Sequence, residues 1–237
     1  RGLEALIRGA RGSGFVASPS TVSVLQRQLV AANRPGGSEN SNRPGGSENS
    51  NRPAGGEGEA RIRRVAVTAL NATGAIDDTY TRAMFDLDPQ VRRLSVAGVV
   101  GEAGAAIRAA TIARGLVDRD PMVRYEALRV HGRSIAITDC AAQIAAVDDT
   151  NPHVALLAID QLATACGGAP AATLVLEAVV FEKPPAPPRR TMLDQPTDAW
   201  LRPSHAIVSL VRRDPGAADW RAILETLAQH RVWQVRL

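Results

Sequence analysis

Aromatic residues and lysine are scarce in this sequence. Three Phe, two Tyr and three Trp stand among 237 residues, so the 45% of hydrophobic positions are mostly Ala, Val, Leu and Ile, which suits thin, closely packed helical layers. Lys183 is the single lysine beside 27 arginines. We interpret the richness in Arg, Ala, Gly and Pro as genome composition, so the net charge of +4 indicates nucleic-acid binding only weakly. No run approaches the roughly 20 apolar residues of a membrane helix, and we predict no membrane span.

Motifs of metal and catalytic chemistry are also missing. The two cysteines, Cys140 and Cys166, form no C-x-x-C pair, which disfavours a zinc site and a disulfide framework. We therefore expect both as reduced, unpaired core residues. None of the four histidines has the spacing of a metal ligand, and His131 falls at a core position. With no G-x-S-x-G sequence either, we predict no catalytic residue, no metal and no cofactor.

One short motif recurs along the chain: an acidic residue or Asn, then Pro, any residue, an aliphatic residue and often Arg. Clear and weaker copies are found at 59–63, 88–92, 120–124, 151–154 and 233–236. The aliphatic residues of the first four copies are 29, 32 and 31 residues apart, and they are Ile62, Val91, Val123 and Val154. This period predicts an array of small helical repeats rather than one closed core.

Each copy of the motif begins a predicted helix with one buried face. The residue four positions after the aliphatic residue is always small, and these residues are Ala66, Ser95, Ala127 and Ala158. Asp or Asn before the proline is the expected N-cap. We name these motif-started helices B helices. Apolar periodicity predicts partner A helices over 20–32, 76–87, 105–117, 137–147, 170–181 and 217–229, with a leftover B helix over 2–10 and a last one near 232.

The motif D-P-x-V-R, with a small residue four positions after the valine and an aliphatic residue near the eighth, resembles the HEAT-repeat family and its short bacterial relatives. The resemblance covers most of residues 58–168 and, more loosely, 200–237. It implies an all-α fold, a right-handed α-solenoid of two-helix repeats over residues 1–237, with B helices on the concave face. It also implies a ladder that links neighbouring repeats through Arg63, Asp88, Arg92, Asp120 and Arg124. Ala155 replaces the arginine in the fourth B helix, where we expect the ladder to be broken.

Two insertions fall in connections from an A helix to a B helix. Residues 33–59 hold the nonapeptide NRPGGSENS twice, followed by a related third copy, and predict a disordered segment produced by slippage duplication. Residues 182–199 are rich in proline and predict extended geometry. Such connections share one edge of a solenoid, so this edge is either a binding side or a place that tolerates added length.

Candidate partner-binding residues come from the predicted concave face and the last B helices. They are Arg93, Arg129, Trp200, Arg202, His205 and Trp233. Glu126 and Asp160 are predicted on faces similar to those of the arginines, and their negative charge disfavours nucleic-acid binding. For the two tryptophans, packing beneath a loop is the alternative.

The leading functional hypothesis is a non-catalytic scaffold that binds a protein or peptide through its concave face or its insertion-bearing edge. The tracts 200–210 and 232–236 also resemble bacterial proteins that join HEAT-like repeats to a cyclophilin-type peptidyl-prolyl isomerase. That resemblance implies a substrate-positioning region of a larger enzyme and export to the cell envelope, with a cytoplasmic location as the alternative. Nucleic-acid binding and a bilin lyase are weaker alternatives. We interpret the chain, which runs from Arg1 to Leu237, as a fragment of a longer protein.

Overall fold

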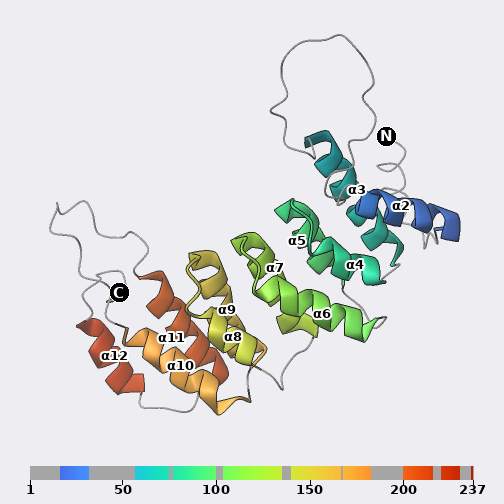
Figure 1. The fold of residues 1–237 in the computed structure, drawn as a ribbon. Coiled ribbons are helices and arrows are strands. Elements are labelled where there is room, and N and C mark those ends of the chain that lie inside the picture. Colours follow the sequence, from blue (N-terminus) through green and yellow to red (C-terminus); the bar gives the residue numbers. More distant parts are fainter. Residues whose placement is uncertain are drawn as a thin grey trace, which may run out of the picture. The chain divides into compact units, whose positions relative to one another are not determined.

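The computed structural model describes residues 17–31, 57–74, 77–99, 104–134, 140–166, 168–182, 200–215, 220–229 and 236. Within these ranges every regular element is an α-helix and no strand is present, which confirms the predicted all-α class (Figure 1). Five predicted features lie wholly or mostly outside the described residues: the helices over 2–10 and near 232, the insertions at 33–59 and 182–199, and Trp233. The chain divides into two compact units, residues 1–130 and 131–237.

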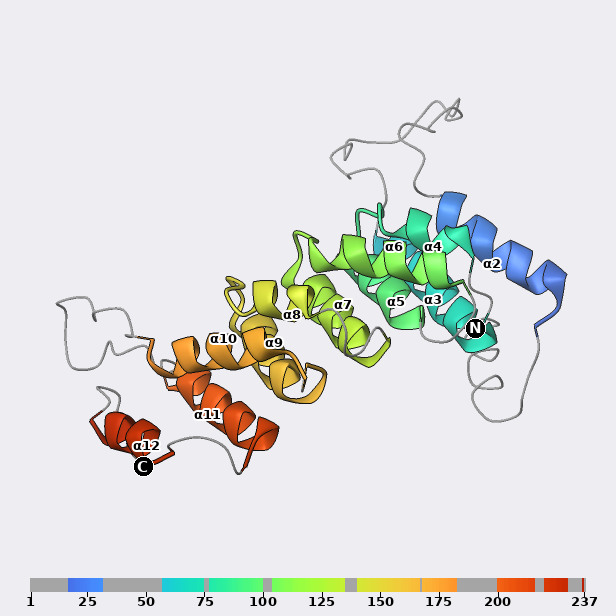
Figure 2. The ribbon, with the colours of Figure 1, turned by 90° about the horizontal axis from the view of Figure 1, so that it is seen from below.

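Unit 1 (residues 1–130) contains alternating A and B helices, as the sequence predicts. Its A helices are α2 (Pro19–Ala31), α4 (Asp78–Ala83) and α6 (Ala105–Leu116). Its B helices are α3 (Glu57–Thr73), α5 (Pro89–Gly98) and α7 (Pro121–Ser134), of which the last runs past the boundary of the unit. Helix α4 packs on both α2 and α6, and α5 packs on α3, so helices of one kind are neighbours (Figure 2).

Unit 2 (residues 131–237) contains α8 (Ala141–Ala146), α9 (Pro152–Thr164), α10 (Pro170–Val180), α11 (Leu201–Arg213) and α12 (Trp220–Ala228). Helix α9 packs on α8, α10 and α11, and α10 also packs on α11. The A helices are α8, α10 and α12, and the B helices are α9 and α11. Helices α8, α9, α10 and α12 overlap segments for which the sequence predicts a helix, and α11 includes His205, which we place at the start of one of the last B helices.

The B helices begin as predicted, with a capping side chain followed by proline. Asp88 Oδ1 accepts a hydrogen bond from Gln90 N at 2.9 Å, and Asn151 Oδ1 accepts one from His153 N at 3.0 Å. Proline stands at the first helical position of both helices, where its missing N–H donor costs nothing. These local signals therefore fix where α5 and α9 start.

The small residues four positions after the motif aliphatic residue lie in the core. All of them are completely buried, and they are Ala66, Ser95, Ala127 and Ala158. The motif valines of α5, α7 and α9 are buried as well. Ile62 is 47% exposed, so its predicted core position is wrong. Helix α3 packs on α2 and α5, and neither of these helices covers Ile62.

Helix α4 is shorter than the predicted segment 76–87 because a turn replaces its last residues. The backbone N–H groups of Phe85 and Asp86 still donate to carbonyl groups three residues back. The Asp86 carboxylate then accepts a hydrogen bond from Asp88 N at 2.9 Å. This side chain offers the backbone an alternative to a further helical turn, so α4 ends at Ala83. The resulting turn, residues 84–88, carries the candidate site.

Candidate functional site

The turn between α4 and α5 is held by a buried ion pair with α3. Arg63 donates from Nε to Asp86 Oδ2 at 2.7 Å and from Nη2 to Asp86 Oδ1 at 3.1 Å. The Arg63 side chain is 5% exposed and that of Asp86 is fully buried. Two parallel hydrogen bonds of this kind fix orientation as well as distance. The 84–88 turn is therefore fastened to the preceding B helix.

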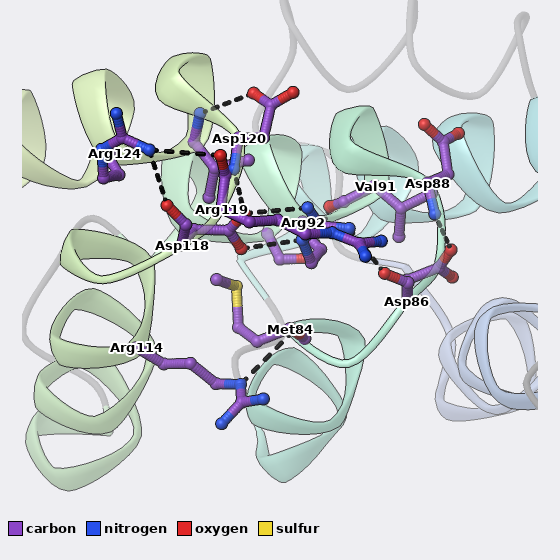
Figure 3. Close-up of polar contacts among 12 residues, drawn as sticks. Met84, Asp86, Asp88, Val91, Arg92, Arg114, Asp118, Arg119, Asp120 and Arg124 are labelled. Atoms are coloured by element: carbon purple, nitrogen blue, oxygen red, sulfur yellow. Dashed lines mark hydrogen bonds and ion pairs between the residues drawn. The ribbon is translucent and has the colours of Figure 1, made fainter. Parts of the chain in front are cut away.

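Arg92, in α5, fastens two successive turns to each other. It donates from Nε and Nη2 to the two carboxylate oxygens of Asp118, at 2.7 and 2.8 Å. Its third nitrogen, Nη1, donates to the carbonyl oxygens of Asp86 at 2.8 Å and Leu87 at 3.2 Å. Figure 3 shows Arg92 between the 84–88 turn and the 117–120 turn, which joins α6 to α7. The position of one turn thus depends on that of the other. We name Arg92, Asp118 and the two carbonyl groups the clamp.

The acceptors of these arginines differ from those that the family resemblance implies. Arg63 and Arg92 reach Asp86 and Asp118, two residues before the motif aspartates. Asp120 instead caps α7, where its Oδ1 accepts from Met122 N at 2.9 Å and Val123 N at 3.2 Å. At these two positions the ladder therefore uses the carboxylates that precede the capping aspartates.

Asp88 combines a cap with a link to the neighbouring repeat, but its partner is not a motif arginine. Its Oδ2 accepts from Arg64 Nε at 2.5 Å, while its Oδ1 caps α5. Arg124 Nη1 donates to the carbonyl oxygens of Asp118 at 2.8 Å and Arg119 at 3.2 Å. This is the geometry that Arg92 adopts one turn earlier, toward Asp86 and Leu87. The clamp on the turn backbone therefore repeats.

The sequence contains a signal for the aspartates that accept the hydrogen bonds of Arg63 and Arg92. An aspartate stands two residues before the cap in three copies of the motif, as Asp86, Asp118 and Asp149. Each accepts a hydrogen bond from the backbone N–H two residues later, at 2.9, 2.9 and 2.8 Å. The pattern D-x-(D or N)-P thus specifies a turn with two successive carboxylate or amide caps. Counting this pattern would have identified the ladder carboxylates.

The electrostatics of Asp118 make the clamp sensitive to acid. Burial raises the pKa of Asp118, but hydrogen bonds from Arg92 and from the Asp120 backbone N–H, with the positive charge of Arg92, hold this pKa below its ordinary value of 3.8. The hydrogen bond to Asp118 in turn raises the pKa of Arg92. A depressed carboxylate pKa means that the folded state favours the ionised form.

We expect unit 1 to lose stability as the pH falls below about 4, where Asp118 begins to be protonated in the unfolded chain. The stabilisation is present above the ordinary pKa and is lost as the pH falls through the lower, folded-state pKa. Urea unfolding at a series of pH values measures this. Asp118→Asn should unfold more easily at neutral pH and show a weaker acid dependence than the unsubstituted chain. Asp78→Asn, at an exposed carboxylate, is the control. An unchanged acid dependence in Asp118→Asn would contradict this account.

Large apolar side chains stand exposed at the clamped turns. Phe85 is 61% exposed, Leu87 is 70% exposed and Val117 is 80% exposed. Met122, in the first turn of α7, is 39% exposed. We name these four residues the turn patch. Phe85 and Val117 occupy equivalent places, one residue before the carboxylates Asp86 and Asp118, so the patch repeats from one turn to the next.

Arg114, in α6, lies against this patch. Its guanidinium carbon is 3.7 Å from the centre of the Phe85 ring, close enough for a cation–π contact. Its Nε donates to the Met84 carbonyl oxygen at 3.5 Å, and Figure 3 shows Arg114 reaching toward that backbone. The contact places a positive charge beside exposed apolar surface.

In unit 2, Cys140 and Cys166 form a disulfide bond, so the expectation of unpaired thiols is wrong. Cys140 is the N-cap residue of α8, and Cys166 follows the end of α9. Their Cα atoms are 5.8 Å apart, within the usual range for a disulfide. Because α8 and α9 pack together, residues 26 positions apart in the sequence meet at one end of the pair. Both cysteines are buried, as predicted.

His131 occupies a buried position, which confirms the interpretation that it is a core residue. Its Nδ1 lies 3.0 Å from Gln143 Nε2, which also donates to Gln161 Oε1 at 3.2 Å. This hydrogen-bonded group links the last turn of α7 to α8 and α9. Within the described ranges, no group of three or more His, Cys, Asp or Glu residues could hold a metal ion.

Three of the predicted partner-binding residues contact groups within their own unit. Arg129 pairs with Glu126 of its own helix, which raises the pKa of Arg129. Arg202 donates to the Val147 carbonyl oxygen at 2.6 Å and to Glu182 Oε2 at 3.1 Å. His205 Nδ1 lies 2.8 Å from Asp160 Oδ1. The remaining candidates are Arg93 and Trp200, both half-buried, and Trp233, which lies outside the described residues.

Comparison with known proteins adds no family: neither a model of a protein family nor a curated protein matches this sequence. The HEAT-repeat resemblance therefore rests on the motif and its spacing. None of the described helices is both long and apolar enough to cross a membrane.

Proposed function

We propose that this chain is a non-catalytic, HEAT-like helical scaffold that binds a protein or peptide partner at the turn patch. The observation that carries the proposal is the exposure of Phe85, Leu87 and Val117 at adjacent turns. Arg92 holds these two turns together, and large apolar side chains exposed on neighbouring turns are typical of a place where another molecule binds. The sequence predicts two possible binding surfaces, the concave face and the insertion-bearing edge. The turn patch supports the edge, because its turns are connections from an A helix to a B helix, as the two insertions are.

The clamp explains how an exposed patch can also be a rigid one. Hydrogen bonds and ion pairs of Asp86, Asp118 and Arg92 hold the turns, so the turns do not depend on apolar contacts for their position. Phe85 and Val117 take no part in these ion pairs, so the clamp does not require apolar side chains at their positions. A surface that is held in place before binding loses less conformational entropy on association.

The concave B-helix face has less support in the described residues. Arg129 and His205 are engaged with Glu126 and Asp160, and Arg202 is engaged with Glu182. These carboxylates partly neutralise the predicted basic residues, which also weakens the nucleic-acid alternative. The isomerase-fusion and bilin-lyase hypotheses stay untested predictions.

The disulfide favours one of the two predicted compartments. Disulfide bonds persist in oxidising surroundings such as the periplasm or the outside of the cell, and are rare in the cytosol. Cys140–Cys166 is a buried bond between two packed helices, as expected of a structural disulfide. We therefore propose that the scaffold works in the cell envelope or beyond.

The expected result of Phe85→Ser, Leu87→Ser and Val117→Ser together is loss of partner binding in a chain that still folds. Short random peptides displayed on phage are selected against the unsubstituted chain, and their affinity is then measured for both proteins. Removing three apolar anchors should weaken the selected peptides by a hundredfold or more, about 3 kcal/mol. Circular dichroism checks that the variant is folded.

Val24→Ser with Ile62→Ser is the matched control, because both residues are exposed apolar residues elsewhere in unit 1, each 47% exposed. This variant should bind the selected peptides as the unsubstituted chain does. Arg93→Glu tests the concave face. If Arg93→Glu abolished binding while the triple variant retained it, the turn patch would not be the binding surface.

A further inference from the structure

The 84–88 and 117–120 turns of unit 1 contain four aspartates, and three of these are paired with arginines. Asp86 pairs with Arg63, and Asp118 pairs with Arg92. Asp88 pairs with Arg64, and its side chain is 7% exposed. The fourth, Asp120, uses one carboxylate oxygen to cap the N-terminus of α7. The three paired carboxylates are satisfied inside the fold and are poorly placed to attract a partner's cation.

Two arginines beside the patch are in the opposite situation. Arg114 and Arg119 are both exposed. Among the described residues neither is within ion-pair distance of a carboxylate, although the charge of Arg119 also acts on Asp118, whereas Arg82 is paired with Asp78. Arg114 lies over the Phe85 ring, and Arg119 stands between Val117 and Met122 in the sequence. The patch therefore presents apolar side chains together with positive charge.

From this combination we infer that the turn patch binds an acidic, apolar peptide segment of a partner protein. The inference rests on the proposed function and adds the chemistry of the partner. Apolar side chains of the segment cover Phe85, Leu87 and Val117, while its Asp or Glu residues pair with Arg114 and Arg119. Such pairs at the rim of an apolar contact select the partner by charge and speed its association.

The repeat of the turns also sets a spacing for the partner. Phe85 and Val117 come from turns that follow the neighbouring helices α4 and α6. Packed helices stand about 8–10 Å apart, which a chain in the polyproline II conformation covers in about three residues, and it places residues three positions apart on the same face. The segment should therefore carry apolar residues about three positions apart, with a carboxylate near each.

The insertion at 33–59 does not meet this description. It contains glutamates but, apart from Ala54, no aliphatic or aromatic side chain that could cover the patch. A second copy of the chain is the other possible occupant, and it is an outcome of the test below.

The test repeats the phage selection with the full chain and with the charge-reversed variant Arg114→Glu, Arg119→Glu. Peptides selected by the unsubstituted chain should be enriched in Asp and Glu, and should bind the charge-reversed variant about tenfold more weakly or worse. Peptides selected by the variant should instead be enriched in Lys and Arg. Arg82→Glu, outside the patch, is the control and should keep the acidic preference. Both arginines are exposed, so the variants should fold, and circular dichroism verifies this.

The outcomes separate the inference from the proposed function. If the triple serine variant loses binding but charge reversal changes neither affinity nor peptide composition, the apolar patch binds partners and the acidic preference is overturned. If neither variant affects binding, or if no peptide prefers the unsubstituted chain, both proposals fail. Concentration-dependent self-association in sedimentation that the triple variant abolishes would identify a second copy as the occupant and overturn the inference.

Discussion

Replacing Arg92 with Met is expected to destabilise unit 1 by about 3–5 kcal/mol. The Asp118 carboxylate, whose side chain is 7% exposed, would lose both hydrogen bonds from Arg92 and keep a buried charge. The carbonyl oxygens of Asp86 and Leu87 would also lose a donor. Removing one partner of a buried pair costs more than the pair contributes, because the other partner stays desolvated. Urea unfolding followed by far-ultraviolet circular dichroism measures the loss.

Arg82→Met is the matched control, because Arg82 and Asp78 are an exposed pair, with side chains 59% and 69% exposed. Such pairs stabilise proteins by about 0–1 kcal/mol. Arg92→Lys should fall between the two, since one ammonium group cannot reach a carboxylate and two carbonyl groups in the same planar geometry. Equal effects of Arg92→Met and Arg82→Met would show that the clamp does not hold the turns together.

Removing the disulfide by Cys140→Ser and Cys166→Ser is expected to destabilise unit 2 by roughly 3–4 kcal/mol, from the loss of a cross-link that closes a loop of 26 residues. Helix α8 has only six residues and is too short to be stable alone. The bond fastens its first turn to the end of α9, in which Ala155 stands in place of the motif arginine.

Tryptophan fluorescence reports this change separately, because Trp200, Trp220 and Trp233 all belong to unit 2. A thiol reductant should lower the unfolding midpoint of the unsubstituted chain to that of the double variant and leave the variant unchanged. If the oxidised chain reacted with a thiol reagent in denaturant as readily as the reduced one, the cysteines would be unpaired and this prediction would fail.

Local features of the fold were predictable from the sequence. Asp88 and Asn151, each followed by proline, begin their helices, because the cap and the missing donor act within a few residues. The small residues Ala66 and Ala158 are buried as the helical period predicts. Such signals need no knowledge of which helices become neighbours.

Features that depend on distant parts of the chain were not predicted. The arginine ladder joins residues 23 and 26 positions apart, and the motif alone does not tell which of two aspartates Arg63 or Arg92 reaches. The cysteines were expected to be unpaired because their spacing matches no framework. Phe85 and Leu87 fall within a predicted helix, but the Asp86 turn ends that helix early and leaves both side chains in water.

The most direct test of the central claim is a methyl-labelled nuclear magnetic resonance titration of the 237-residue chain with a peptide selected by it. Leu87 and Val117 have methyl groups in the turn patch, while Leu94 and Ala97, both half-buried, have theirs in the B helix α5. The account predicts the largest chemical-shift changes at Leu87 and Val117, with little change at Leu94 and Ala97. Large changes at Leu94 and Ala97 with Leu87 and Val117 unmoved would contradict it, and would place the binding surface on the B helices.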